Sequence, residues 1–132
     1  MTETLIQVRE LAKTYYTEAG EIPVLHGINM DIQQGEFVAI MGASGSGKST
    51  FMNILGCLDK ASSGEYRLAG QVVANLDKDS LAKLRNRVIG FVFQGFNLLS
   101  RTTLADNVAL PLVYAQVGHA ERQQRAEKML EK

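Results

Sequence analysis

The sequence predicts an α/β fold built around a glycine-rich phosphate-binding loop. Residues 42–49 have the sequence Gly-Ala-Ser-Gly-Ser-Gly-Lys-Ser, which fits the pattern G-x-x-x-x-G-K-[ST]. The apolar run 37–41 before it is typical of a buried parallel strand, and the apolar segment 50–55 after it is typical of a buried helix. The β-rich run 88–93 predicts a second buried strand. These observations together predict part of a parallel core sheet with helices.

The residues before the loop predict a smaller antiparallel part. Residues 5–8 indicate a first strand, and the segment 15–23, with its glycine and proline, indicates a turn or loop. Apolar residues then alternate with polar ones over 24–32, as in an antiparallel strand with one buried face. Residues 33–36 form a tight turn into the strand that precedes the loop.

Beyond the first helix, short strands are expected at 65–68 and 71–73. We expect Asp79 or Ser80 to cap a helix with one apolar face, which carries three side chains: Leu81, Leu84 and Val88.

Two further helices are predicted near the end of the chain. Thr102 or Thr103 is expected to cap a short helix that ends near Pro111. A final amphipathic helix follows Gly118. Its apolar face carries Ala126, Met129 and Leu130, and Glu121 and Arg125 form a favourable i,i+4 pair.

The residue types of the loop predict phosphate binding. Glycines at 42, 45 and 47 let the backbone turn its N–H groups inward without a Cβ in the way of an anion. The helix that follows then presents its unpaired N–H groups and positive dipole end to the phosphates. Lys48 supplies a cation for the β- and γ-phosphates, and the Ser49 hydroxyl can ligate Mg²⁺. The alternative is a glycine- and serine-rich turn that binds nothing.

The composition limits the other classes of function. A chain of 132 residues holds one domain at most, and its 14 basic and 14 acidic residues provide no net field for nucleic acid or an anionic membrane. No apolar run reaches membrane-spanning length and no signal pattern opens the chain, so a cytoplasmic protein is expected. Cys57, as a lone cysteine, is expected to be a small buried hydrophobe. His26 and His119 are assigned no chemistry.

The loop and its surroundings resemble the ATP-binding subunits of ABC transporters. The resemblance rests on the loop, on residues 35–40 before it, and on residues 53–64, which look like the macrolide-export and lipoprotein-release branch. It covers nearly the whole chain from Leu5 to the last helix. It implies the N-terminal portion of a P-loop NTPase fold, with an antiparallel β subdomain and part of a parallel core sheet.

The resemblance also implies individual site residues. Tyr15 matches the aromatic residue that stacks on adenine, although the adjacent Tyr16 could take that place, and a tyrosine packed at a strand end is the alternative. Gln94 matches the glutamine that contacts Mg²⁺ and the attacking water, and a solvated loop glutamine is its alternative. The catalytic residues are then Lys48 and Gln94, and the metal-binding residues are Ser49 and Gln94. The nucleotide-binding set is Tyr15, Gly42, Ser44, Gly45, Ser46, Gly47, Lys48, Ser49 and Thr50.

Cofactors and partners follow from the same resemblance. The family uses ATP and Mg²⁺ to drive export of a substrate and works with a transmembrane permease subunit or domain. Its ATPase subunits pair head to tail as a homodimer, on the inner face of the cell membrane. Phe96, Leu98 and Leu99 could form the patch that docks on the permease, or they could be buried in the helical part of the chain.

Parts needed for hydrolysis are missing from these residues. No run of four apolar residues is followed by Asp-Glu to hold Mg²⁺, and Leu-Ser-Gly-Gly-Gln is absent. We therefore expect residues 1–132 to be the incomplete N-terminal part of one ATP-binding domain, inactive and weakly ATP-binding alone. A non-hydrolysing nucleotide-binding module is the alternative. A GTPase is disfavoured because the sequence lacks Asn-Lys-x-Asp.

Overall fold

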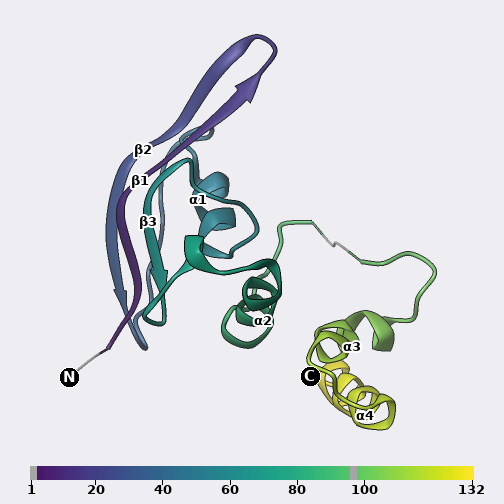
Figure 1. Ribbon diagram of the computed structural model, residues 1–132. Helices are drawn as coiled ribbons and strands as arrows, with labels where there is room; N and C mark the ends of the chain where they lie inside the picture. Colours follow the sequence, from purple (N-terminus) through teal and green to yellow (C-terminus); the bar gives the residue numbers. More distant parts are fainter. Residues whose placement is uncertain (1–2, 96–97) are drawn as a thin grey trace. The chain divides into compact units, whose positions relative to one another are not determined.

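The computed structural model describes residues 3–95 and 98–132 of the chain. These residues form two compact units, Met1–Leu81 and Ala82–Lys132 (Figure 1). The first unit contains a β-sheet and the helix that follows the glycine-rich loop, and the second contains a pair of helices.

The sheet of the first unit has four antiparallel strands in the order β2-β1-β3-β4. Strands β1 (Thr4–Thr17) and β2 (Gly20–Gln33) form a long hairpin, and β3 (Ser63–Leu68) and β4 (Gln71–Val72) follow on the other side of β1. The antiparallel part that the sequence predicts is therefore confirmed.

The hairpin is longer than predicted, because the segment 15–23 is mostly strand rather than loop. Tyr15 pairs with Ile22, and only two residues form the turn between the strands. Gly20 follows that turn with φ +122°, a conformation that glycine adopts at little cost. One glycine is therefore enough to reverse the chain here.

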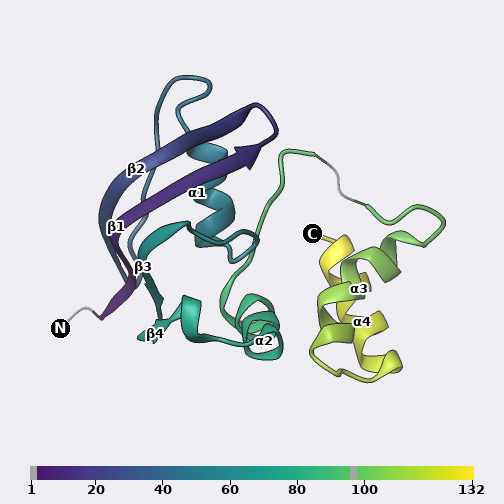
Figure 2. The same cartoon turned by 45° about the horizontal axis from the view of Figure 1, so that its top comes forward.

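Helix α1 (Lys48–Leu55) lies against one face of this sheet, and the predicted helix after the loop is confirmed (Figures 1 and 2). The buried apolar residues of this unit are Val8, Leu11, Leu25, Phe51, Ile54, Cys57, Tyr66 and Leu68. The Tyr66 hydroxyl donates to the Leu55 carbonyl at 2.6 Å, and burial raises the pKa of Tyr66. Cys57 is buried as expected, although it lies in the turn after α1 rather than in the helix. Apolar burial between strands β1, β2 and β3 and helix α1 thus holds this unit together.

A short 3₁₀ helix, η1 (Val73–Asn75), leads from β4 to helix α2 (Lys78–Val88). The helix exists as predicted, but its cap is different. Asp77 accepts a hydrogen bond from the Ser80 N–H at 2.7 Å, so Asp77 caps the helix rather than Asp79 or Ser80. On its predicted apolar face only Leu84 is buried.

The second unit contains helices α3 (Leu104–Tyr114) and α4 (His119–Leu130), which pack against each other. Thr103 caps α3 as predicted, since its Oγ1 accepts from the Asp106 N–H at 3.0 Å. Pro111 does not end α3. Its ring is exposed, and its carbonyl still accepts from the Ala115 N–H at 3.1 Å, so the helix continues past it.

Helix α4 begins after Gly118, as predicted, and Glu121 and Arg125 form the expected pair at 3.9 Å. Its predicted apolar face is only partly buried. Ala126 is 1% exposed, whereas Met129 and Leu130 are 61% and 47% exposed.

The two predicted parallel strands are not strands in the structure. Residues 37–41 and 89–93 follow no regular secondary structure, and Phe37 and Val92 are 97% and 96% exposed. A strand is defined by hydrogen bonds to a neighbouring strand, and no other part of the described chain pairs with either segment. Among residues 3–95 and 98–132, no helix combines the length and apolar character needed to cross a membrane.

Candidate phosphate-binding site

The glycine-rich loop joins residue 41 to helix α1 and takes the conformation that its glycines allow. Gly45 and Gly47 have φ values of +80° and +95°, in the left-handed region that other residues rarely adopt. The Ser46 N–H donates to the Ala43 carbonyl at 3.1 Å and tightens the turn. Gly47 is the N-cap of α1, and no side chain of residues 3–95 or 98–132 caps this helix end. The first N–H groups of α1 therefore have no partner within the helix.

Lys48 folds its side chain back over the loop. Its Nζ donates to the Gly42 carbonyl and to the Ala43 carbonyl, the latter at 2.7 Å, and lies 3.5 Å from Ser46 Oγ. Gly42 leaves room for this arrangement, because a Cβ there would lie 2.6 Å from Ser46 Oγ. Atoms of the loop thus hold the ammonium group of Lys48 in place.

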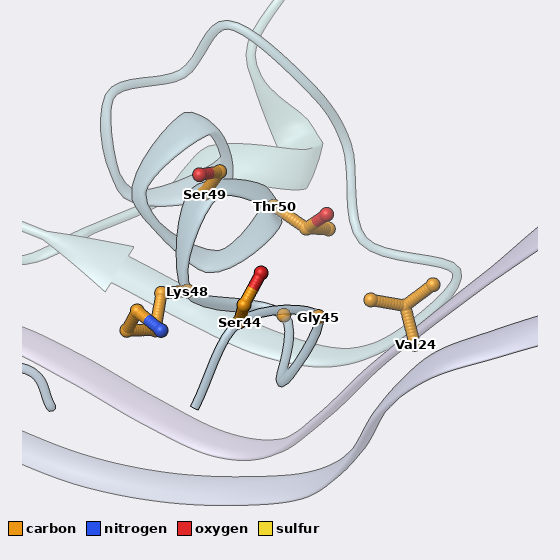
Figure 3. Close-up of a pocket in the computed structure, with 7 residues that line it drawn as sticks. Val24, Ser44, Gly45, Lys48, Ser49 and Thr50 are labelled. Carbon is orange, nitrogen blue, oxygen red and sulfur yellow. The ribbon is translucent and has the colours of Figure 1, made fainter. Parts of the chain in front are cut away.

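A concavity of about 450 Å³ opens beside the loop. Its lining residues are Val24, Ser44, Gly45, Gly47, Lys48, Ser49 and Thr50. Figure 3 shows Val24 and Lys48 on opposite sides of Ser44 and Gly45. Most of the predicted nucleotide-binding residues therefore lie together, while Gly42 and Ser46 contribute through their contacts with Lys48.

The charges around this concavity suit a polyanion. Among the described residues that line it, Lys48 alone is charged, and the first turn of α1 contains no acidic residue. The helix dipole and the unpaired N–H groups add positive potential at the same place. Ser49 lies in this turn and is exposed, so its hydroxyl is available to a hydrated cation that accompanies the anion.

Val24 is the lining residue that the sequence did not single out. It is the extra residue of a bulge in β2, between the pairs Lys13–Leu25 and Thr14–Pro23. No sequence signal marks this bulge, because the alternation of apolar residues over 24–32 predicts a regular strand. The bulge places Val24 beside the start of α1, where a Cβ on Gly47 would lie 3.2 Å from Val24 Cγ1.

Tyr15 is not among the described residues that line this concavity, and Gln94 belongs to the second unit. Tyr15 is on β1, 37% exposed, and its hydroxyl donates to Asp59 Oδ2 at 3.0 Å. Tyr16 beside it is 73% exposed. Gln94 is exposed at a bend in the second unit. The adenine contact of Tyr15 and the roles of Gln94 in metal binding and catalysis stay predictions.

The predicted docking patch is only partly described. Leu98 and Leu99 are 58% and 50% exposed, so neither is buried in the helical part of this unit. Phe96 lies outside the described residues. The role of this patch stays a prediction.

The sequence matches one protein-family model, described as ABC transporter, over residues 25–132. Among curated proteins, it is 52% identical to the uncharacterized ABC transporter ATP-binding protein YknY of Bacillus subtilis over 97% of this chain. It is also 52% identical to the macrolide export ATP-binding/permease protein MacB of Escherichia coli, again over 97% of this chain. The chain spans 56% of the YknY sequence and 20% of the MacB sequence.

The fold is similar to solved ATP-binding cassettes. The structure matches a post-hydrolysis dimer of the cassette MJ0796 bound to ADP and Pi, with a TM-score of 0.88 and 43% sequence identity. A second dimeric structure of MJ0796, a bacterial ABC transporter cassette, gives the same TM-score at 45% identity. Each match covers 96% of this chain and 56% of the other.

Proposed function

The chain belongs to the ABC transporter family, and we propose that residues 42–50 bind the phosphates of Mg²⁺-ATP. The observation that carries this proposal is the start of α1. Two left-handed glycines, an uncapped helix N-terminus and one lysine meet at a concavity whose lining, over the part of the chain that the structure describes, has no carboxylate. This combination favours a ligand with several negative charges.

Within this site, each residue type has its own role. Lys48 places its ammonium against the terminal phosphates, and the loop glycines let the backbone N–H groups approach them. The Ser49 hydroxyl ligates the Mg²⁺ that accompanies ATP. Tyr15 contributes a flat ring for the adenine base.

Hydrolysis and transport belong to the same proposal, at the level of the protein that contains this sequence. Gln94 is proposed to bind Mg²⁺ and to orient the attacking water. These 132 residues contain no apolar run followed by Asp-Glu, so this chain by itself is proposed to bind nucleotide without hydrolysing it. By itself it thus acts as a nucleotide-binding module.

Partners are proposed from the relatives. The name of MacB joins an ATP-binding part and a permease in one protein, which supports a transmembrane permease as a partner of this chain. The dimeric MJ0796 structures support pairing with a second ATP-binding subunit. The protein would then lie on the inner face of the cell membrane through its permease, and its substrate would be exported.

Calorimetric titration of the 132-residue chain with Mg²⁺-ATP tests the binding proposal. We expect saturable binding that Lys48→Ala weakens by about 10- to 150-fold, as for loss of a hydrogen bond to a charged group. Lys78→Ala is the matched control, since Lys78 is an exposed lysine of α2 in the same unit and is not among the described residues that line the concavity, and it should leave affinity unchanged.

Circular dichroism of each variant shows whether the fold persists. Phosphate release from Mg²⁺-ATP by the chain alone should stay at the buffer rate. Unchanged ATP affinity in a folded Lys48→Ala variant would refute the assignment of this loop.

A further inference from the structure

One carboxylate, Asp59, holds two side chains of β1. Its Oδ2 accepts from the Tyr15 hydroxyl at 3.0 Å, and its Oδ1 lies 3.2 Å from Lys13 Nζ. Lys13 Nζ also donates to the Lys60 carbonyl at 2.6 Å, and its side chain is only 13% exposed. The three side chains therefore form one connected cluster on the sheet face that carries α1.

Hydrogen bonds also join the backbone around this cluster to β1 and to α1. Ser62 donates its N–H to the Ala12 carbonyl at 2.9 Å, and its Oγ accepts from the Thr14 N–H at 2.9 Å. Asp59 lies just after α1, where its N–H and that of Leu58 both reach the Asn53 carbonyl. A continuous path thus runs from the phosphate-binding loop through α1 and Asp59 to the ring of Tyr15.

The two faces of the Tyr15 ring are not equivalent. Lys13 Nζ lies over the ring, 5.0 Å from its centroid, so a cation covers one face. Tyr15 as a whole residue is nevertheless 37% exposed. A planar base can stack only on the face that Lys13 does not cover.

The position of the ring along the hairpin suits the base of a nucleotide whose phosphates lie in the loop. The bulge that aims Val24 into the concavity lies opposite Lys13 and Thr14. Tyr15 is the next residue of β1, about 3.3 Å further along the strand. The ring and the phosphate-binding loop therefore flank the same stretch of the hairpin.

We propose that Asp59 and Lys13 are positioning residues for base recognition: they hold the Tyr15 ring in place and determine which of its faces the base uses. This inference rests on the proposed function, because it takes nucleotide binding at residues 42–50 and base stacking on Tyr15 as given. It adds two residues, neither of which touches the nucleotide. Asp59 acts through the Tyr15 hydroxyl, and Lys13 acts through the ring face and the shared carboxylate.

Two ligands separate positioning of the base from general stability. Mg²⁺-ATP has a base, whereas inorganic tripolyphosphate has only the charged chain. We expect Tyr15→Ala to weaken ATP binding by about 5- to 150-fold, the range for stacking of one base on an aromatic ring. Asp59→Ala should weaken it by about 3- to 10-fold, since the ring remains but is no longer held. Tripolyphosphate affinity should be unchanged in both.

Three further variants and one control test the mechanism. Tyr15→Phe keeps the ring but cannot reach Asp59, so it should reproduce the loss seen with Asp59→Ala, and combining both changes should add no further loss. Asp59→Asn keeps an acceptor for the hydroxyl and should recover part of the affinity. Asp31→Ala is the matched control, because Asp31 pairs with Arg9 at 2.7 Å on the same sheet without touching Tyr15. It should change neither affinity.

The outcomes distinguish this inference from the proposed function. If the wild-type chain binds neither ATP nor tripolyphosphate, the proposed function fails. If it binds both, and Tyr15→Ala weakens ATP binding while Asp59→Ala does not, the positioning role is overturned and the proposed function survives. Equal loss of both ligands in a folded Asp59→Ala variant would also overturn the positioning role, because the effect would then concern the phosphate loop.

Discussion

Substitution of Gly47 by alanine tests how the start of α1 is seated against β2. Gly47 has φ +95°, and a Cβ added there would lie 2.8 Å from Leu25 Cδ2 and 3.1 Å from the Val24 carbonyl oxygen. Leu25 is 4% exposed, so its side chain is buried and has little room to retreat. The Val24 oxygen belongs to the backbone of β2 and can move only with the strand.

The chain provides a matched control two residues earlier. Gly45 has φ +80°, but a Cβ there would meet nothing within 4 Å. Alanine in the left-handed region costs about 1–2 kcal/mol at either position. Alanine also lowers the conformational entropy of the unfolded chain, which stabilises both variants by about 0.4–1 kcal/mol. Only Gly47→Ala adds overpacking, which costs about 1–3 kcal/mol. The two variants should therefore differ in free energy of unfolding by about 1–3 kcal/mol.

Urea denaturation followed by far-UV circular dichroism measures this difference. We expect Gly45→Ala to lose no more than about 1.6 kcal/mol, the largest strain less the smallest entropic gain, and Gly47→Ala to lose about 1–3 kcal/mol more. Equal losses in the two variants would refute the reasoning, because the contact with Val24 and Leu25 would then contribute nothing beyond backbone strain.

Two other predictions concern single hydrogen bonds. Tyr66→Phe removes the bond to the Leu55 carbonyl and should cost about 1 kcal/mol at neutral pH. Because burial raises the pKa of Tyr66, the folded chain should lose stability as pH rises above the ordinary tyrosine value of about 10, and this loss should be smaller in Tyr66→Phe. Urea denaturation below and above that pH measures the loss of stability. Identical pH dependence in the two proteins would contradict the prediction. Thr103→Ala removes the cap of α3 and should cost about 1 kcal/mol, whereas Thr103→Ser should keep most of the stability; equal losses in thermal melts would argue against the cap.

The phosphate-binding loop could be predicted from the sequence because its function depends on local residue types. Left-handed turns need glycine at 45 and 47, and the charge comes from the adjacent Lys48. The helix after the loop, the cap of α3 and the start of α4 after Gly118 also depend on local residue types. For these elements, neighbours within a few residues decide the conformation.

The predicted parallel strands failed for the opposite reason. Residues 37–41 have the composition of a buried strand, yet a strand forms only beside a neighbouring strand. Composition does not indicate which segment would pair with residues 37–41. The prediction that α3 ends near Pro111 also differs from the structure. A proline is a common helix end, but in α3 its exposed ring is tolerated and the helix continues to Tyr114.

The sequence alone determined the phosphate-binding loop, the antiparallel part of the sheet and the family resemblance, because each rests on motifs or alternation patterns that lie within short segments of the chain. Only the tertiary structure decided that a bulge at Val24 lines the concavity and that Asp59 holds Tyr15 and Lys13. Asp59 and Tyr15 are separated by 44 positions in the chain. Their contact arises because the turn after α1 packs against β1, and a packing of this kind leaves no periodic signal in the sequence.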